Sequence, residues 1–443
     1  MATLIQGGII VTMDPDRRIL RDAGLVLVED RIAWLGDSQQ VPDQYRTASR
    51  IDATGKVVYP GLVNIHTHAA LSILRGVGDD LGIAPAYSPH VPQGVYLSPD
   101  DCYILSLLGG LEALKFGTTC IVDNYIHARE AAKAFDTLGL RAVVSERLHD
   151  ADLFQVPDGI FEFDRDRGEA LLAKGLALIE QWDGVSNRRI QCRLGPHAPD
   201  TCSTELLQTI QTEAERRQVG LVIHLAQSRR ELLEIDRRTG KTPTAYLANL
   251  GLLGPQMIAG HCIYMTPGDI ELLRQTQTHV SHQSGSNAKS GMMAPIKTML
   301  EKGINVGLGT DNMAGDMIEV MRLAVCIARM LAEEPVALRA IEALEMATVN
   351  GAKALGMAEE IGSIEVGKKA DLILVDYRRP HLVPVIDPVA NLVHNGLGSD
   401  VDTVIVDGQI VVEAGQVQTI DELNLLNEAQ AVTEARWAEM TRR

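Results

Sequence analysis

The sequence predicts an α/β fold: a (β/α)8 TIM-like barrel with a small β-sandwich domain built from both chain ends. Two observations lead to this prediction. Apolar strand-like runs alternate with amphipathic helical stretches through the middle of the 443-residue chain, and this alternation is typical of a parallel sheet covered by helices. Short β-rich runs separated by turn residues occur near both ends, and chain termini commonly lie close together.

The expected domain limits follow this pattern. The first part of the small β domain would span residues 1–57, where β-rich runs are separated by Asp, Arg and Gly turns. Its second part would span 366–420 and contains an Asp-Gly hairpin signal at 407–408. The barrel would occupy 58–365, and the charged, Ala/Leu-periodic tail predicts a C-terminal helix over 421–443.

Eight apolar runs in the barrel region have the length of buried strands. They are 61–66, 118–123, 141–145, 190–194, 220–224, 257–261, 278–282 and 304–308. Helical stretches lie between them, for example 101–115 after a predicted N-cap at Ser98, and 203–217. The active site of such a barrel lies at the carboxyl ends of its strands, and the Gly/Pro-rich loop 70–97 is long enough to cover that face.

Metal-competent side chains stand at these strand ends. His66 and His68 close the first strand and point the same way, because side chains alternate along a strand, so the two imidazoles can hold one metal ion. Shared placement at one rim favours a metal site over separate buried histidines. The other candidates at the rim are His197, His224, His261, His282 and Asp311, after the fourth to the eighth strand in turn.

Composition narrows the class of partner. A formal net charge of −17 makes nucleic acid an unexpected partner, and 46% hydrophobic with 22% charged residues indicates a soluble globular protein. The N-terminus lacks a signal-peptide pattern and no window approaches 18 unbroken apolar residues, so we expect a cytoplasmic protein with no membrane contact. A small-molecule substrate and a homo-oligomer, which is common for such barrels, are expected.

The chain resembles the metal-dependent amidohydrolase superfamily, in the branch that contains atrazine chlorohydrolase-like, S-adenosylhomocysteine deaminase-like and guanine deaminase-like enzymes. The resemblance extends over nearly the whole chain. It rests on the segments 60–68, 195–199, 259–262, 286–287, 307–311 and 361–371, together with the segment around His224.

The resemblance implies a mononuclear site with His66, His68, His224 and Asp311 as the metal ligands. Zinc is the first expectation for this single divalent transition metal ion, and iron or cobalt would also suit imidazole and carboxylate ligands. The dinuclear branches need a bridging lysine at the end of the fourth strand. This chain has Leu-Gly-Pro-His at 194–197, with no lysine.

The resemblance also suggests catalytic roles. A bound divalent ion lowers the pKa of water toward neutrality, and Asp311 would take the proton from that water. His261 would polarise the electrophilic carbon or stabilise the negative charge that develops on the substrate. The expected substrate-binding residues are His197, His282, Asn287 and Arg147. Their structural alternatives are a hydrogen bond for His282, a helix cap or turn for Asn287, and a salt bridge to Glu146 or Asp150 for Arg147.

The chain departs from the branch at one catalytic position. Its deaminases usually carry a glutamate three residues after the fifth-strand histidine, where it shuttles protons to the leaving nitrogen, but here the residue is Gln227. An amide cannot relay a proton as a carboxylic acid does, although it can orient the substrate through hydrogen bonds. Glu231 or Glu234 could compensate in part, but charges on a following helix are usually solvated.

The predicted function is that of a metal-dependent hydrolase acting on non-peptide carbon–nitrogen bonds of a small molecule. The family default is deamination or dechlorination of an N-heterocycle of the purine, pterin or triazine type. Gln227 raises the alternative of a urea, carbamate or thiocarbamate hydrolase, as in phenylurea and molinate hydrolases. A second alternative is a binding barrel without catalysis, which the intact ligand set disfavours.

Overall fold

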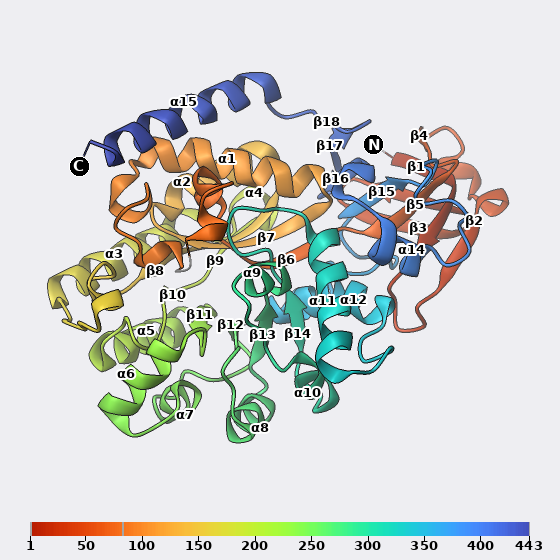
Figure 1. Ribbon diagram of the computed structural model, residues 1–443. Helices are drawn as coiled ribbons and strands as arrows, with labels where there is room; N and C mark the ends of the chain where they lie inside the picture. The colour runs from red at the N-terminus through yellow and green to blue at the C-terminus, as the bar shows by residue number, and fades with distance from the viewer. Residues whose placement is uncertain (1, 82–83, 443) are drawn as a thin grey trace.

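The computed structural model describes residues 2–81 and 84–442, which form a TIM-barrel-like α/β fold beside a large mixed sheet (Figure 1). The predicted domain limits at residues 1 and 443 lie outside the described residues, as do positions 82–83 of the loop predicted over 70–97. Within the described part, every helix is too short or too polar to cross a membrane.

Both ends of the chain contribute to one sheet of nine strands. Its order is β18-β17-β16-β15-β5-β1-β2-β3, with β4 paired to β1. Antiparallel pairing of β15 with β5, from Leu372 opposite Pro60 to Asp376 opposite Lys56, joins the two ends. The strands are β1 (Ala2–Val11), β2 (Ile19–Val28), β3 (Arg31–Asp37), β4 (Ser49–Asp52), β5 (Lys56–Pro60), β15 (Leu372–Asp376), β16 (Val401–Val406), β17 (Gln409–Glu413) and β18 (Gln416–Val417).

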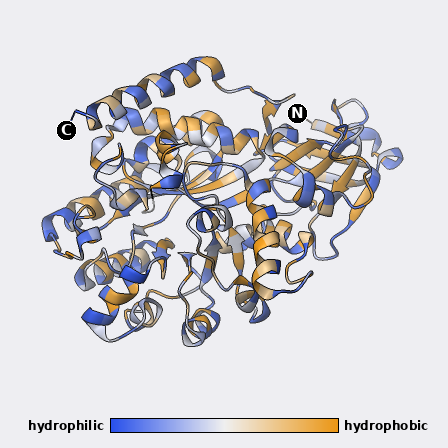
Figure 2. Cartoon of the chain, viewed as in Figure 1, coloured by the Kyte–Doolittle hydropathy of each residue, from blue (hydrophilic) through white to orange (hydrophobic). Residues whose placement is uncertain are grey.

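Apolar side chains from both ends hold this sheet together. Leu25 and Leu27 of β2, Val58 of β5, and Leu372 and Leu374 of β15 belong to one buried cluster, and burial of each such side chain is worth about 1.5–3 kcal/mol. Figure 2 shows hydrophobic stretches along these strands. The β-rich runs predicted near both ends do form strands, but all nine join one hydrogen-bonded sheet, so the sandwich arrangement stays a prediction.

The eight strands predicted in the middle of the chain are present, and the fourth, β9, is followed by an additional short strand, β10. They pair in parallel in two sheets, β10-β8-β7-β6 with β9 on β8, and β11-β12-β13-β14. Single parallel bridges, Leu194 to Leu221 and Thr67 to Asp311, connect the two sheets at both edges. The strands are β6 (Leu62–Thr67), β7 (Thr118–Tyr125), β8 (Arg141–Leu148), β9 (Ile190–Cys192), β10 (Gly195–Pro196), β11 (Leu221–Leu225), β12 (Met257–His261), β13 (His279–His282) and β14 (Val306–Leu308).

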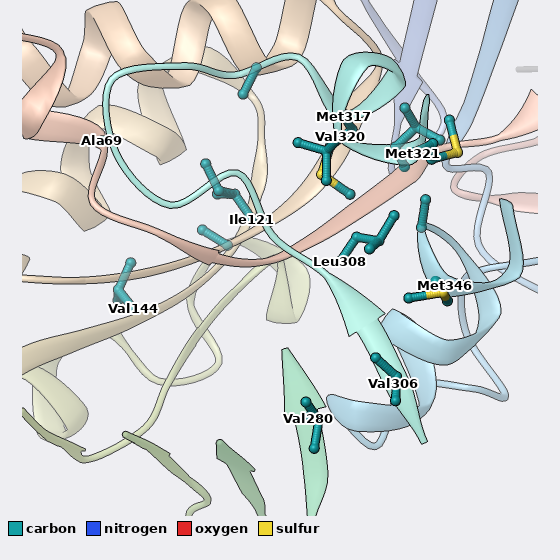
Figure 3. Close-up of a cluster of buried hydrophobic side chains, with 14 of the residues drawn as sticks. Ala69, Ile121, Val144, Val280, Val306, Leu308, Met317, Val320, Met321 and Met346 are labelled. Carbon is teal, nitrogen blue, oxygen red and sulfur yellow. The ribbon is translucent and has the colours of Figure 1, made fainter. Parts of the chain in front are cut away.

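Helices lie around the parallel strands (Figure 1). Ile121 of β7 and Leu308 of β14 share a buried cluster with Met317 and Met321 of α11 and with Met346 of α12 (Figure 3). The helices are α1 (Pro99–Lys115), α2 (Ala128–Leu138), α3 (Arg165–Trp182), α4 (Val185–Arg188), α5 (Thr204–Arg217), α6 (Arg229–Thr239), α7 (Pro243–Asn249), α8 (Pro267–Thr276), α9 (Ser284–Lys289), α10 (Ile296–Glu301), α11 (Met317–Ala332), α12 (Ala340–Met346), α13 (Val349–Ala354), α14 (Pro388–Asn395) and α15 (Glu422–Met440).

Capping and ion pairs fix α1 and the last helix, α15. The predicted N-cap Ser98 accepts the Asp101 N–H through its Oγ at 3.2 Å, and the Asp101 carboxylate accepts the Ser98 N–H at 2.8 Å, which is a capping box. α15 lies along α1 (Figure 1), where Arg436 pairs with Asp101 at 2.8 Å. Trp437 Nε1 donates to the carbonyl of Ile73 at 3.1 Å, so α15 also holds the start of the covering loop.

The covering loop contains short 3-10 turns. They are η3 (Ala69–Leu74), η4 (Gly78–Asp80), η5 (Pro85–Tyr87) and η6 (Gly94–Tyr96). Tyr87, at the end of η5, is buried, so this part of the loop is packed onto the barrel face.

A buried ion pair joins the parallel strands to the nine-stranded sheet and gives a stability prediction. Arg141 of β8 donates Nε to Asp371 at 2.7 Å, and both side chains are at most 4% exposed. Substitution Arg141→Leu leaves the Asp371 carboxylate buried without its partner, and we expect the free energy of unfolding, measured with urea, to fall by about 3–5 kcal/mol.

The matched control is Glu360→Gln, which removes the exposed pair between Arg31 and Glu360, 44% and 46% exposed. It should change the free energy of unfolding by less than about 0.5 kcal/mol. Equal losses of unfolding free energy in the two variants would contradict the stabilising role of the buried pair between Arg141 and Asp371.

Candidate metal centre and active site

Five predicted site residues converge at the carboxyl ends of the parallel strands. His66 lies on β6, His68 follows it, His224 lies on β11, His261 ends β12, and Asp311 follows β14. Donor atoms of His66, His68 and His224 lie within 4.8 Å of one another, as do those of His66, His261 and Asp311. All five side chains are buried. The rim predicted from the strand order therefore brings these residues together.

Backbone contacts between β6 and the end of β14 place the carboxylate beside the imidazoles. The Asp311 N–H donates to the carbonyl of His66 at 2.9 Å, and the His68 N–H donates to the carbonyl of Asp311 at 3.2 Å. A Cβ at Gly309 would lie 2.7 Å from the Cβ of His66, so only glycine permits this approach.

Hydrogen bonds set the tautomers of two histidines. His68 Nδ1 lies 2.6 Å from the carbonyl of Asn124, and His224 Nδ1 lies 2.7 Å from the carbonyl of His197. A carbonyl only accepts, so each Nδ1 donates and each Nε2 keeps a lone pair. The two Nε2 atoms lie 3.2 Å apart, a separation at which both can lie about 2.0–2.1 Å from one zinc ion.

His66 supplies a further open donor. Its Nε2 is buried and has no hydrogen-bond partner among the described residues. Burial, with the neighbouring imidazoles, holds the pKa of His66 and of His224 well below the usual value. Burial also lowers the pKa of His68, against the opposing effect of Asp311. Neutral imidazoles are the form that binds metal, so this donor set fits a divalent transition metal ion.

Asp311 faces both the imidazole cluster and the cavity. Its Oδ1 lies 3.5 Å from His68 Nε2 and 3.8 Å from His66 Nε2. Its Oδ2 accepts a hydrogen bond from Ser286 Oγ at 2.6 Å and lies 4.0 Å from His261 Nε2. One oxygen is thus placed for a cation while the other can hold a proton.

Asn287 fixes the tautomer and orientation of the His261 ring. The Asn287 Oδ1 lies 3.0 Å from His261 Nδ1, so the ring donates from Nδ1, and the His261 N–H donates to Gln283 Oε1 at 2.8 Å. The His261 backbone at the strand end has a φ of +67°, and the ring Nε2 lies 4.0 Å from Asp311 Oδ2. Asn287 Nδ2 is buried with no partner among the described residues and lies in the cavity wall, where it can donate to a substrate.

A cavity of about 540 Å³ opens above this cluster, within the usual range for small-molecule sites. Arg147, His197, Gln227 and Asn287 line it, whereas His282 is buried on β13 outside the lining. The contact of His282 with substrate therefore stays a prediction.

His197 offers a hydrogen-bond acceptor to the cavity, whereas Arg147 offers donors. His197 Nδ1 lies 2.9 Å from Thr201 Oγ1, whose own proton goes to the carbonyl of Ala198, so His197 Nε2 is left as an acceptor. Arg147 is buried, lies with its guanidinium carbon 4.9 Å from the Tyr125 ring centre, and keeps Nε unpaired among the described residues. Glu146 and Asp150 accept backbone N–H groups instead of pairing with Arg147.

Gln227 lies in the cavity wall just after β11. Its Nε2 donates to the hydroxyl of Tyr87 at 3.4 Å, and Arg230 stacks over the Tyr87 ring at 4.4 Å. Glu231 and Glu234 are both buried, at 0% and 4% exposure, and lie outside the lining. The expectation that these helix charges are solvated was wrong, because Glu231 and Glu234 lie with Ile235 on the buried face of α6.

Two contacts were not assigned from the sequence. Ser286 hydrogen-bonds Asp311, and its only sequence signal was its place beside Asn287. Arg230 lines the cavity, and its position three residues after Gln227, at the start of α6, was the signal that could have found it.

Comparisons with known proteins identify the family of this chain. The amidohydrolase family model matches residues 57–411. A 5'-deoxyadenosine deaminase from Methanosarcina acetivorans is 40% identical over 97% of each chain. A 5-methylthioadenosine/S-adenosylhomocysteine deaminase from Moorella thermoacetica is 40% identical over 90% of this chain and 91% of that protein.

Solved structures show the same fold. An adenosine deaminase from Xanthomonas campestris with bound zinc has a TM-score of 0.89 at 26% identity, over 98% of each chain. Atrazine chlorohydrolase from Arthrobacter aurescens in complex with zinc has a TM-score of 0.85 at 23% identity, over 97% of this chain and 100% of that one. The second likeness concerns the fold alone.

The cluster predicts which histidine controls metal content. His224→Ala removes a converging Nε2, and we expect metal affinity to fall at least about 100-fold, measured as metal per chain by mass spectrometry after dialysis. His282→Gln alters a buried histidine of the next strand but one and should retain the metal. Equal metal content in the two variants would contradict the assignment of His224 as a metal ligand.

Proposed function

This chain belongs to the amidohydrolase family, and we propose that it removes an amino group from an N-heterocycle by hydrolysis, with adenosine-type nucleosides as the first candidate substrates. The observation that carries the proposal is that donor atoms of His66 cluster with those of His68 and His224, and also with those of His261 and Asp311, beside a cavity of about 540 Å³. The enzyme is a hydrolase acting on carbon–nitrogen bonds, and the substrate class follows the names of its relatives as deaminases of adenosine analogues.

We further propose that His66, His68, His224 and Asp311 hold one divalent transition metal ion, with zinc as the first choice and iron or cobalt as alternatives. The unpaired His66 Nε2 and the facing Nε2 atoms of His68 and His224 support this ligand set. Such an ion would supply water acidified toward neutral pH as the nucleophile.

The protein's own groups then handle protons. Asp311 accepts the proton of the attacking water and passes it to the leaving nitrogen, which departs as ammonia, and Ser286 holds the Oδ2 of Asp311 in place. A proton taken up at His261 Nε2 gives an imidazolium that can donate to the substrate while Nδ1–H stays bonded to Asn287. Arg147, His197 and Asn287 bind the substrate, and a direct contact with His282 requires a rearrangement of the wall.

Gln227 shapes the reaction that this site can perform. Its amide can donate to a ring nitrogen beside the reacting carbon, but it cannot carry a proton to the leaving group. The urea or carbamate alternative that this residue raised is not favoured, because the relatives are named as deaminases of nucleosides. The family membership and the converging ligands also disfavour a binding barrel without catalysis.

The finer architecture is also a proposal. The bridges Leu194 to Leu221 and Thr67 to Asp311 support closure of the parallel strands into a (β/α)8 barrel. The division into 1–57 with 366–420, 58–365 and 421–443 is supported by the shared nine-stranded sheet and the separate last helix. A homo-oligomer and a cytoplasmic location stay predictions.

The direct test of function is a substrate panel assayed with metal-loaded protein. We expect ammonia release, followed by mass spectrometry, from one or more of adenosine, 5'-deoxyadenosine, 5'-methylthioadenosine and S-adenosylhomocysteine. Asp311→Asn, checked for bound metal, should abolish that release. Amine release from phenylureas without ammonia release from any nucleoside would overturn the proposal.

A substitution at Gln227 is predicted to raise kcat, whereas most active-site substitutions lower it. Gln227→Glu places a proton-carrying acid at the position, and we expect kcat for ammonia release to rise at least about 10-fold, because a well-positioned general acid usually contributes about 100-fold or more. Gln227→Ala should lower kcat, because the hydrogen bond to substrate is lost. An unchanged or lower kcat in Gln227→Glu would show that proton transfer uses another group.

A further inference from the structure

Glu231 occupies a buried position directly behind Gln227. Its side chain is 0% exposed. Oε1 accepts the N–H of Ala226 at 2.8 Å, and Oε2 accepts the N–H of Gln227 at 2.8 Å. The Glu231 N–H in turn donates to Ser228 Oγ, the N-cap of α6, at 3.2 Å. The carboxylate therefore ties the start of α6 to the turn that precedes it.

That turn also touches the segment after His261. Ala226 has a φ of +50°, a conformation that few residues adopt without support. Its carbonyl accepts N–H bonds from Ile263 at 3.1 Å and Tyr264 at 3.0 Å. The turn at Ala226 is therefore held from two sides. The Glu231 carboxylate binds its N–H groups, and the segment after His261 binds its carbonyl.

We propose that Glu231 is a positioning residue that aims Gln227 into the cavity, and that it does not serve as a substitute proton relay. The inference rests on the proposed function for its kinetic consequence. Both carboxylate oxygens are engaged by backbone N–H groups, and the side chain is sealed from the cavity. A relay would need an oxygen that faces the leaving group, and Glu231 has none.

A carboxylate is the side chain that suits this role. Its two separate oxygens give each of the two adjacent N–H groups an acceptor of its own. In Glu231→Gln the amide NH2 faces one of these backbone N–H groups, so a donor meets a donor and one bond is lost. Burial, reinforced by the charge of the neighbouring Asp200, raises the pKa of Glu231 well above its usual value, and the two N–H bonds oppose this by favouring the ionised form.

The first test measures the turn itself and needs no substrate. Hydrogen–deuterium exchange by mass spectrometry on the metal-loaded protein should show peptide 224–230 exchanging at least about 10-fold faster in Glu231→Gln than in the wild type. Glu234→Gln is the matched control, because Glu234 is buried on the same helix but pairs with Arg237 and touches neither N–H. Unchanged exchange in Glu231→Gln would overturn the inference.

The second test asks whether Glu231 acts through Gln227. We expect Glu231→Gln to lower kcat for ammonia release about 10-fold with metal content retained, and Glu234→Gln to leave it unchanged. In the Gln227→Ala background the Glu231→Gln effect should shrink to less than about 2-fold, because residues that act as a unit are non-additive. An equal loss in both backgrounds would overturn the positioning role.

The outcomes separate the two proposals. If the wild-type enzyme releases no ammonia from any nucleoside, the proposed function fails, and the exchange measurement still decides whether Glu231 holds the turn. If Glu231→Gln does not fold, Glu231→Asp replaces it, because the shorter carboxylate keeps the charge but cannot reach both N–H groups. Faster exchange of peptide 224–230 in Glu231→Asp supports the inference, and unchanged exchange overturns it.

Discussion

The contact between β6 and the residues after β14 is the constraint on which the site depends. Two backbone hydrogen bonds, from Asp311 to the carbonyl of His66 and from His68 to the carbonyl of Asp311, join segments about 240 residues apart in sequence. They bring a carboxylate into a buried group of imidazoles whose lone pairs face one another. Such a group is unfavourable without a cation or protons to compensate it, and the metal ion that we propose would supply that compensation.

The second layer of the site consists of groups that hold the reactive side chains in fixed orientations. Main-chain carbonyls set the tautomers of His68 and His224, and Asn287 does the same for His261. Asn124 lies on β7, His197 follows β10, and Asn287 lies on α9, which follows β13. A barrel suits this arrangement because each strand end delivers one side chain while the next element supplies the group that orients it.

Much of this arrangement could be predicted from the sequence. Period and composition located all eight parallel strands, and the strand order then placed His66, His68, His224, His261 and Asp311 at one rim. Other features depend on depth and on contacts between distant residues, which the alternation of side chains does not reveal. His282 ends its strand as predicted but lies outside the cavity lining. Glu231 has the local sequence of a solvated helix residue, yet two backbone N–H groups draw it inside.

The nine-stranded sheet shows the same limit. Its strands were recognisable, but a short run of residues does not specify its partners, so one continuous sheet could not be distinguished from two stacked ones. The Gln227 substitution was visible in the sequence, whereas its contact with Tyr87 required the folding of the covering loop.

The proposed metal centre can be tested most directly by anomalous X-ray scattering at the zinc absorption edge, from crystals of zinc-loaded protein. We expect one peak per chain, about 2.0–2.2 Å from Nε2 of His66, His68 and His224 and from a carboxylate oxygen of Asp311. A peak elsewhere in the molecule, or no peak at this cluster in protein that contains one zinc per chain, would contradict it.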